Sequence, residues 1–286
     1  MKTATISAVS FSVLYALMII FQQYVVKDNS FRDFIFWSYV TTLLLTVTYA
    51  LIRNSRKLIV KSIRGWTLGA LVGISASVLA DSFILIGLQS APSLNWGILS
   101  QLGVPLTFLF AVLWLSERFN ISKILAILVS IVGAVLVVVQ TNQKLDFGLG
   151  NLWFLSAVVF LAMANILSQY ALRSMTILQL NFVRLLTAVI ILGLGLWIWP
   201  TGGRVVWWIA IVNGTAILIG MSLVSLTIQK AGAAFFSIGA NLIPVFIALF
   251  SILIFGIWPT SYQIMGGVLI IISIWIFYLD KLRHRC

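Results

Sequence analysis

The sequence predicts an all-α membrane protein with ten transmembrane helices, arranged as two inverted repeats of five helices. Three observations carry this prediction: the composition, the lengths of the apolar runs, and a polar pattern that returns in the second half. The chain of 286 residues is 62% hydrophobic and 8% charged, with a mean hydropathy of +1.13. Soluble domains carry about 25% charged residues, so the composition excludes a soluble globular protein.

Ten apolar runs, each 17 to 25 residues long, follow one another along the chain. A helix needs about 20 residues to cross a hydrocarbon core of ~30 Å, so each run predicts one transmembrane helix. Strands of a membrane barrel would alternate polar and apolar residues over about ten positions, and these runs do not alternate. The runs cover residues 3–26, 34–52, 66–88, 96–116, 124–140, 151–172, 178–199, 205–229, 234–256 and 263–279.

The distribution of Lys and Arg predicts a protein of the cytoplasmic (inner) membrane with both termini in the cytoplasm. If the N-terminus is inside, the inner segments hold 13 basic residues and the outer segments hold 4, and cytoplasmic loops carry such an excess. This topology accounts for the net charge of +12, so the expected partner is the lipid bilayer and not nucleic acid. The inner residues are Lys2, Arg53, Arg56, Lys57, Lys61, Arg64, Arg118, Lys123, Arg173, Lys230, Lys281, Arg283 and Arg285, and the outer ones are Lys27, Arg32, Lys144 and Arg204.

The second half of the chain repeats polar features of the first half. The stretch QYVVK at Gln23–Lys27 returns as QYALR at Gln169–Arg173, 146 positions later and again at the end of an apolar run. Each repeat holds five spans, an odd number, so the second repeat must enter the membrane from the opposite side, as in many secondary transporters. We expect the two repeats to comprise residues 1–143 and 144–286.

Two prolines predict paired helix interruptions in the fourth and ninth runs. Pro105 and Pro244 lack a backbone N–H, which leaves the carbonyls of Gln101 and Ala240 without their helical partners. A side-chain amide lies beside each break, on Gln101 and on Asn241. Interruptions at corresponding positions of two halves indicate the binding site of a transporter. The alternative is a pair of packing kinks, which membrane helices tolerate.

Asp81 is the only carboxylate well inside an apolar run. It continues a stripe of small residues that runs in four-residue steps from Gly65 to Ser77, and such stripes permit close helix contact. We therefore expect Asp81 to face protein and not lipid. It is the candidate for proton coupling, because an ionisable group inside a membrane normally faces a cavity or a partner. The alternative is a structural carboxylate that neighbouring hydroxyls satisfy.

Arg184 is the only cation inside a run, near the predicted cytoplasmic end of the seventh helix. One interpretation is that its long side chain reaches the membrane interface. The other is that its planar fork of donors binds a substrate carboxylate or phosphate.

Amides and aromatic residues supply the remaining site candidates. Gln22, Gln23, Asn165 and Gln169 recur in the first and sixth runs, where they are candidates for lining a cavity or for hydrogen bonds between helices. Trp37 and Tyr39 could form a box for a cation. The alternative places both in an aromatic belt at the interface, where we also expect Trp96, Trp153, Trp207 and Trp208.

The inventory of reactive residues argues against an enzyme. The lone His284 and the lone Cys286 both lie in the basic C-terminal tail, so a His-based metal cluster or a Cys/His nucleophile pair is not expected. The sequence contains no Gly-rich phosphate loop, which makes direct coupling to ATP improbable. We therefore expect no cofactor and no metal.

The stretch from Ala91 through Pro105 to Glu117-Arg118 and on to Gly133 resembles the drug/metabolite transporter superfamily, in its ten-helix EamA type. The shared pattern is a short link, a helix with a proline, an acidic-basic pair at the helix end and a helix with a glycine. The resemblance covers nearly the whole chain. It implies solute movement across a membrane, often the export of metabolites or amino acids.

The second half departs from this pattern in part. It keeps Pro244 but has Gly256-Ile257 where the acidic residue would fall. Arg184 stands where the family often has an arginine in the second helix of a repeat, and the first half has Ser38 there.

The sequence thus predicts a secondary transporter for a small-molecule substrate that is polar or amphipathic, with export of amino-acid-like compounds favoured. Alternating access between the repeats would move the solute, and protons are the candidate coupling ion. The alternative function is a flippase for a lipid or a lipid-linked substrate.

Overall fold

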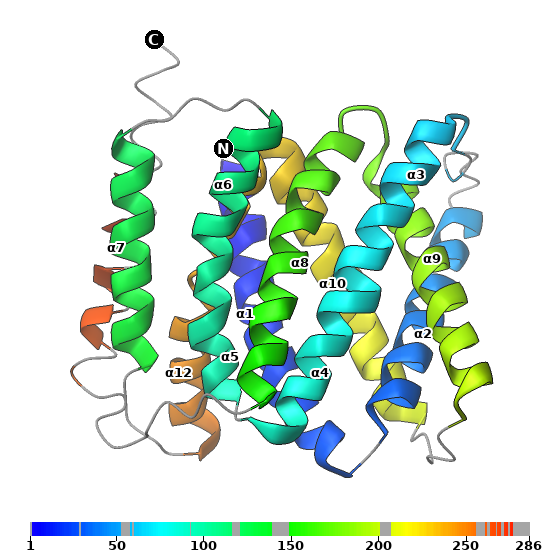
Figure 1. The fold of residues 1–286 in the computed structure, drawn as a ribbon, viewed down its shortest axis with the longest axis horizontal. Coiled ribbons are helices and arrows are strands. Elements are labelled where there is room, and N and C mark those ends of the chain that lie inside the picture. The colour runs from blue at the N-terminus through cyan, green and yellow to red at the C-terminus, as the bar shows by residue number, and fades with distance from the viewer. Residues whose placement is uncertain are drawn as a thin grey trace.

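A computed structural model of the chain describes residues 2–28, 30–52, 58, 60–91, 93–115, 121–138, 149–200 and 207–255, together with ten residues between 261 and 276. Every regular element in these ranges is a helix (Figure 1). Six helical spans are long and apolar enough to cross a membrane: Lys2–Val26, Phe31–Ile52, Ile63–Ser90, Leu149–Ala171, Ile177–Ile198 and Trp207–Ala231. The prediction of a multi-pass, all-α membrane protein is confirmed. In the described ranges, six of the ten predicted spans reach this length.

The first half contains three long spans and a broken fourth one. The third span combines α3, a π-helical segment η2 and α4, and the fourth combines α5, a short 3₁₀ turn η3 and α6. The elements are α1 (Lys2–Asp28), α2 (Phe31–Ile52), α3 (Ile63–Val72), η2 (Gly73–Ala80), α4 (Asp81–Ser90), α5 (Ser93–Leu99), η3 (Ser100–Leu102), α6 (Gly103–Leu115) and α7 (Ile121–Val138).

The second half follows the same order of long and broken helices. The ninth apolar run forms two helices, α11 and α12, while the tenth lies largely outside the described residues. The elements are α8 (Leu149–Ala171), α9 (Ile177–Ile198), α10 (Trp207–Ala231), α11 (Ala233–Ala240) and α12 (Ile243–Phe255).

Both broken runs restart as a helix just before their proline. Pro105 is the third residue of α6 and Pro244 is the second residue of α12. The expectation that each proline lies in a helix interior is therefore wrong in detail. A proline fits the first turn of a helix, where its missing N–H would have no intrahelical acceptor, so the chain breaks on the N-terminal side of the ring.

Hydroxyl side chains inside the spans donate hydrogen bonds to backbone carbonyl oxygens of their own helix. In α2, Ser38 donates to the carbonyl oxygen of Phe34 at 2.7 Å, and Thr42 donates to that of Ser38 at 2.8 Å. A polar group in an apolar layer needs a partner within reach, and the carbonyl four residues earlier provides one. The start of α9 has a capping box, in which Thr176 and Gln179 satisfy each other's backbone N–H groups. Residue type and spacing therefore account for these local features.

The two halves interlock because helices of one half pack against helices of the other. α10 packs along α1 and α2, α8 packs against α4 and α6, and α9 packs against α2 and η2. Glycines lie at close approaches between these helices. A Cβ atom on Gly73 would lie 2.7 Å from the carbonyl oxygen of Arg184, and one on Gly214 would lie 2.6 Å from that of Ser38. The absent side chains let these backbones meet.

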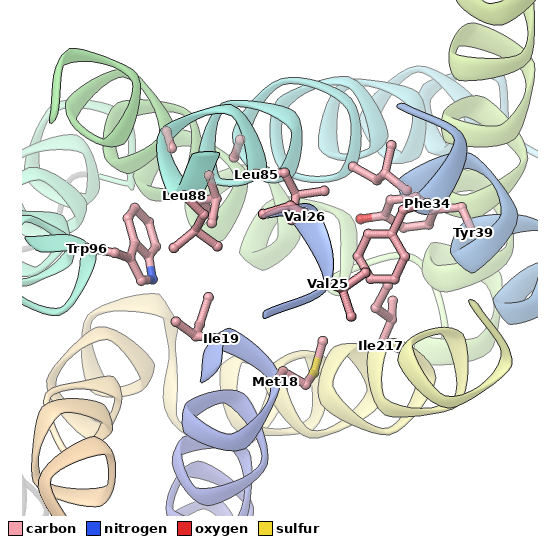
Figure 2. Close-up of a cluster of buried hydrophobic side chains, with 14 of the residues drawn as sticks. Met18, Ile19, Val25, Val26, Phe34, Tyr39, Leu85, Leu88, Trp96 and Ile217 are labelled. Atoms are coloured by element: carbon pink, nitrogen blue, oxygen red, sulfur yellow. The ribbon is translucent and has the colours of Figure 1, made fainter. Parts of the chain in front are cut away.

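An apolar cluster fills the centre of this interlocked bundle. Figure 2 shows Trp96 at one end of the cluster and Tyr39 at the other, with Ile19, Leu85 and other apolar side chains between them. Trp96 is 1% exposed and Tyr39 is 0% exposed. The expectation that both belong to an interfacial aromatic belt is therefore wrong, because apolar neighbours on several helices enclose each ring.

Candidate functional site

A cavity of about 160 Å³ lies between the two halves. It is lined by side chains of α1, α2, α4, α5, α6, α8, α9, α10, α11 and α12, together with η2 and η3. An engineered protein cavity of ~150 Å³ holds a molecule as large as benzene, so the volume suits a small solute. The polar and charged lining residues are Gln22, Asp81, Ser100, Asn165, Ser168, Arg184, Asn213, Ser237 and Asn241.

Two residues of opposite charge lie in the same part of this lining. Asp81 accepts a hydrogen bond from the hydroxyl of Tyr39, and Arg184 donates from Nε to the Ser77 hydroxyl at 2.7 Å. Arg184 and Asp81 both line this cavity. Ser77 lies one turn before Asp81, in the π-helical segment η2, and π-helical segments are frequent at functional sites. The four side chains form one polar cluster, here called the charged cluster.

The contacts of the charged cluster place the Arg184 side chain in the interior of the bundle and not at the membrane interface. The side chain of Arg184 meets η2 and lines the cavity, so it does not reach for the membrane interface. The small-residue stripe before Asp81 packs on α9, with Gly69 against Val183 and Gly73 against the Arg184 backbone. Asp81 accordingly faces protein and cavity.

A second polar network joins the two halves through amides. Gln22 donates from Nε2 to Oδ1 of Asn213 at 3.1 Å, and Asn213 donates from Nδ2 to the Ser38 hydroxyl at 3.0 Å. The network links α1, α2 and α10, and both amide side chains line the cavity. Asn213 was missed in the sequence, although the signal that selected Asn165, an amide inside an apolar run, also applies to it.

A third polar group lies at the breaks in the fourth and ninth runs. The residues Trp96, Ser237 and Asn241 line the cavity, and their atoms Nε1, Oγ and Nδ2 are buried without a hydrogen-bond partner. Trp96 packs against Phe154 with ring centroids 5.5 Å apart, and its nitrogen lies beside the Tyr15 hydroxyl without a hydrogen bond of good geometry. We call these three groups the unpaired donors.

The remaining amide candidates separate into lining and structural residues. Asn165 of α8 lines the cavity, whereas Gln23 is half-buried and does not. Gln169 accepts a hydrogen bond from the backbone N–H of Ala233 at 2.6 Å, so it caps the start of α11 from α8. That turn contains Gly232 at a φ of 92°, which favours glycine.

The structure does not bring Trp37 and Tyr39 together as an aromatic box. Trp37 packs edge-on against Trp207, with ring centroids 4.6 Å apart, while Tyr39 turns inward to Asp81. Residues two positions apart on a helix point to opposite faces. Trp37 therefore does not line the cavity.

Several predicted features fall outside the described residues. The side chains of Gln101 and Pro105, and all of Glu117, Arg118, Gly256 and Ile257, belong to this group. Pro244 is buried at the start of α12, beside Asn241. In the described part of the chain, His, Cys, Asp and Glu do not gather in threes as a metal site would require.

Comparisons with known proteins add a family and a fold. A model of the EamA-like transporter family matches the chain twice, over residues 2–139 and 148–279. An uncharacterized transporter from Synechocystis sp. is 24% identical over 236 residues, which are 77% of this chain and 67% of the relative. A solved structure, described only as the crystal structure of a protein, matches with a TM-score of 0.78 at 16% identity, over 99% of this chain and 98% of the other. At that identity the match shows a shared fold alone.

Proposed function

Because the chain belongs to the EamA-like transporter family, we propose that it is a secondary transporter that exports a small, polar or amphipathic, amino-acid-like metabolite by alternating access. The observation that carries the proposal is the cavity between the halves, which presents both Asp81 and Arg184 to one small volume. Transporters built from inverted repeats hold their substrate at such an interface.

The charges of the lining favour a solute without net charge. Asp81 and Arg184 are the charged side chains among the described lining residues, and their charges cancel. A net charge brought into such a site would lack a counter-charge, and burying an unpaired charge is costly. A zwitterion brings one charge of each sign, so each end finds polar partners in a cavity of mixed polarity. An amino-acid-like compound fits this requirement.

The proposed architecture has ten spans in two inverted repeats, of residues 1–143 and 144–286. Two matches to one family model, one in each half, support it. Figure 1 adds that α1 runs down from the N-terminus, whereas α8 rises to the turn that leads into α9, so the first helices of the two halves run in opposite directions. The breaks between α5 and α6 and between α11 and α12 occupy corresponding places.

The proposed location is the cytoplasmic membrane, with both termini in the cytoplasm. The excess of Lys and Arg in the expected inner segments supports this orientation. Export is the direction that the resemblance to the superfamily favours. Asp81 is the proposed carrier of a coupled proton, because it is the carboxylate that lines the cavity and already binds a hydroxyl.

Flux measurements in liposomes test the proposal. The purified protein is reconstituted, the liposomes are loaded with a mixture of small metabolites, and efflux is compared with that of protein-free liposomes by mass spectrometry. We expect protein-dependent efflux of at least one zwitterionic compound. Absence of flux for every water-soluble solute, with protein-dependent movement of labelled lipid between leaflets, would replace the transporter by a flippase.

A further inference from the structure

We propose that the carboxylate end of the solute binds at the break between α11 and α12, on the unpaired donors Trp96 Nε1, Ser237 Oγ and Asn241 Nδ2. This inference rests on the proposed function and adds the position and orientation of the solute to it. The carboxylate is thus placed away from Arg184, whose Nε already donates a hydrogen bond to Ser77.

These three atoms are exceptions to a strong rule. Most buried polar side-chain atoms in proteins have a hydrogen-bond partner. Four described atoms of this chain do not, and three of them belong to residues that line one cavity. The fourth, Thr107 Oγ1, does not line it. The exceptions are thus concentrated where a ligand would lie, and a ligand is a partner that the isolated chain lacks.

These atoms require a partner of one chemical kind. The indole nitrogen of Trp96 can only donate, the amide nitrogen of Asn241 can only donate, and the hydroxyl of Ser237 can do either. The complementary group is therefore an acceptor with several lone pairs. A carboxylate has two oxygens with about four lone-pair sites, enough to accept from all three donors.

The donors come from two runs that both line the cavity. Ser237 and Asn241 are four residues apart, so they share one face of the ninth run. Trp96 approaches from the fourth run, and Figure 2 shows its nitrogen turned toward Ile19 of α1, one turn beyond Tyr15. Tyr15 packs against the apolar cluster that contains Ile243, and it lines the same cavity as the three donor residues.

The backbone adds to the attraction at the same place. α12 has 13 residues and begins at Ile243, which itself lines the cavity. The N-terminus of a helix carries a partial positive charge and favours anions. The unpaired donors and this helix end therefore act on the same group of the solute.

The other end of the solute then lies toward the charged cluster. Asp81 accepts from Tyr39 and keeps capacity for further donors, since a carboxylate accepts up to about four hydrogen bonds. An ammonium group with three donors is the complement of that capacity. The solute would thus span the cavity, with its amine at Asp81 and its carboxylate at the helix break.

Binding measurements with three related probes test this orientation. Thermal stabilisation of the purified protein is titrated with valine, with 3-methylbutanoate, which lacks the amine, and with valinamide, which lacks the carboxylate. A ligand that binds the folded state raises the melting temperature, and at a given concentration the rise is larger for a tighter ligand. We expect valine to bind most tightly, because it fills both ends of the cavity, and 3-methylbutanoate and valinamide each to bind more weakly, at one end.

Variants of the donors then assign the site. Trp96→Phe and Ser237→Ala each remove one donor, and we expect each to weaken 3-methylbutanoate binding by about 10- to 150-fold, as for one lost hydrogen bond to a charged group. Asn241→Asp keeps the shape but adds a negative charge, so it should abolish 3-methylbutanoate binding while valinamide still binds. A purely structural role for Asn241 would not produce this charge selectivity. Trp197→Phe, at a side chain that is 80% exposed, is the matched control and should leave every affinity unchanged.

Three outcomes would overturn the inference. The first is unchanged affinity for 3-methylbutanoate in all three donor variants. This result would show that the three donors bind ordered water and not the carboxylate. The second is loss of that affinity in Arg184→Gln alone, which would move the carboxylate to Arg184. The third is the absence of wild-type binding by valine and 3-methylbutanoate at millimolar concentrations. If the liposome assay still shows flux of a solute without a carboxylate, the transporter stands and the carboxylate subsite falls.

Discussion

The hydroxyl of Tyr39 on α2 donates a hydrogen bond to the carboxylate of Asp81, at the start of α4. The two side chains belong to different spans of the first half, and Tyr39 is fully buried. This bond fixes the position of the one acidic side chain among the described cavity-lining residues, while the remaining lone pairs of Asp81 stay available to the cavity. A buried hydrogen bond to a charged acceptor also stabilises the folded protein.

Tyr39→Phe should therefore destabilise the protein. A hydrogen bond to a charged group contributes about 1.5–3 kcal/mol, and the phenyl ring keeps the apolar packing. We expect the free energy of unfolding to fall by that amount in mixed-micelle denaturation. Tyr24→Phe is the control, because Tyr24 is 75% exposed. Equal stability of the two variants would show that the Tyr39 hydroxyl does not hold Asp81.

Asp81→Asn should uncouple transport from a proton gradient. The amide keeps the shape of the side chain but cannot titrate, and burial of an ionisable group in the membrane interior otherwise marks ion pathways. We expect the variant to lose accumulation driven by a pH gradient in proteoliposomes while some exchange or downhill flux persists. A variant that still concentrates solute on a pH gradient would remove Asp81 from the coupling mechanism.

Gly214→Ala should separate α10 from α2. Its Cβ atom would lie 2.6 Å from the carbonyl oxygen of Ser38 and 2.9 Å from Thr41 Cβ, and overpacking of this kind costs about 1–3 kcal/mol. Gly195→Ala is the matched control, because nothing lies within 4 Å of its added Cβ. The control should be neutral or stabilising by up to about 1 kcal/mol. The comparison is read from thermal unfolding, and a Gly214→Ala protein as stable as Gly195→Ala would contradict the close contact.

The long helices could be predicted because hydropathy and length are local properties of the sequence. α1, α2, α8, α9 and α10 lie where apolar runs indicated spans, and hydrocarbon thickness sets their minimum length. The broken runs could also be located, since a proline acts on the backbone of its own helix. The position of the helix break relative to the proline was predicted less well, because a proline is equally compatible with the first turn of a new helix.

The contacts of the site could be predicted only in part. The small-residue stripe correctly placed Asp81 against protein, since one helix face is visible in the spacing. Its partner Tyr39 is 42 positions away in the sequence, and no local pattern connects the two. Trp96 was assigned to the interface on residue type alone, because the position of a ring relative to other helices depends on how those helices pack. The partner of Arg184, Ser77, was missed for the same reason.

Cysteine labelling tests the proposed orientation. In a Cys286→Ser background, single cysteines are introduced by Lys144→Cys, Arg56→Cys and Lys123→Cys. A reagent that cannot cross the membrane should label position 144 in intact cells, and label positions 56 and 123 after permeabilisation only. The reverse pattern would invert the topology and would place both termini outside.

A reversible block of the cavity tests the central claim most directly. In the Cys286→Ser background, Ala164→Cys places a thiol on a cavity-lining position of α8, and Val159→Cys places one on the same helix at a side chain that is 42% exposed. Both variants are treated with a bulky methanethiosulfonate reagent, and solute efflux from proteoliposomes is measured before treatment, after treatment and after reduction. We expect treatment to stop efflux through Ala164→Cys, reduction to restore it, and Val159→Cys to transport throughout. Full modification of position 164 without loss of efflux would contradict transport through this cavity.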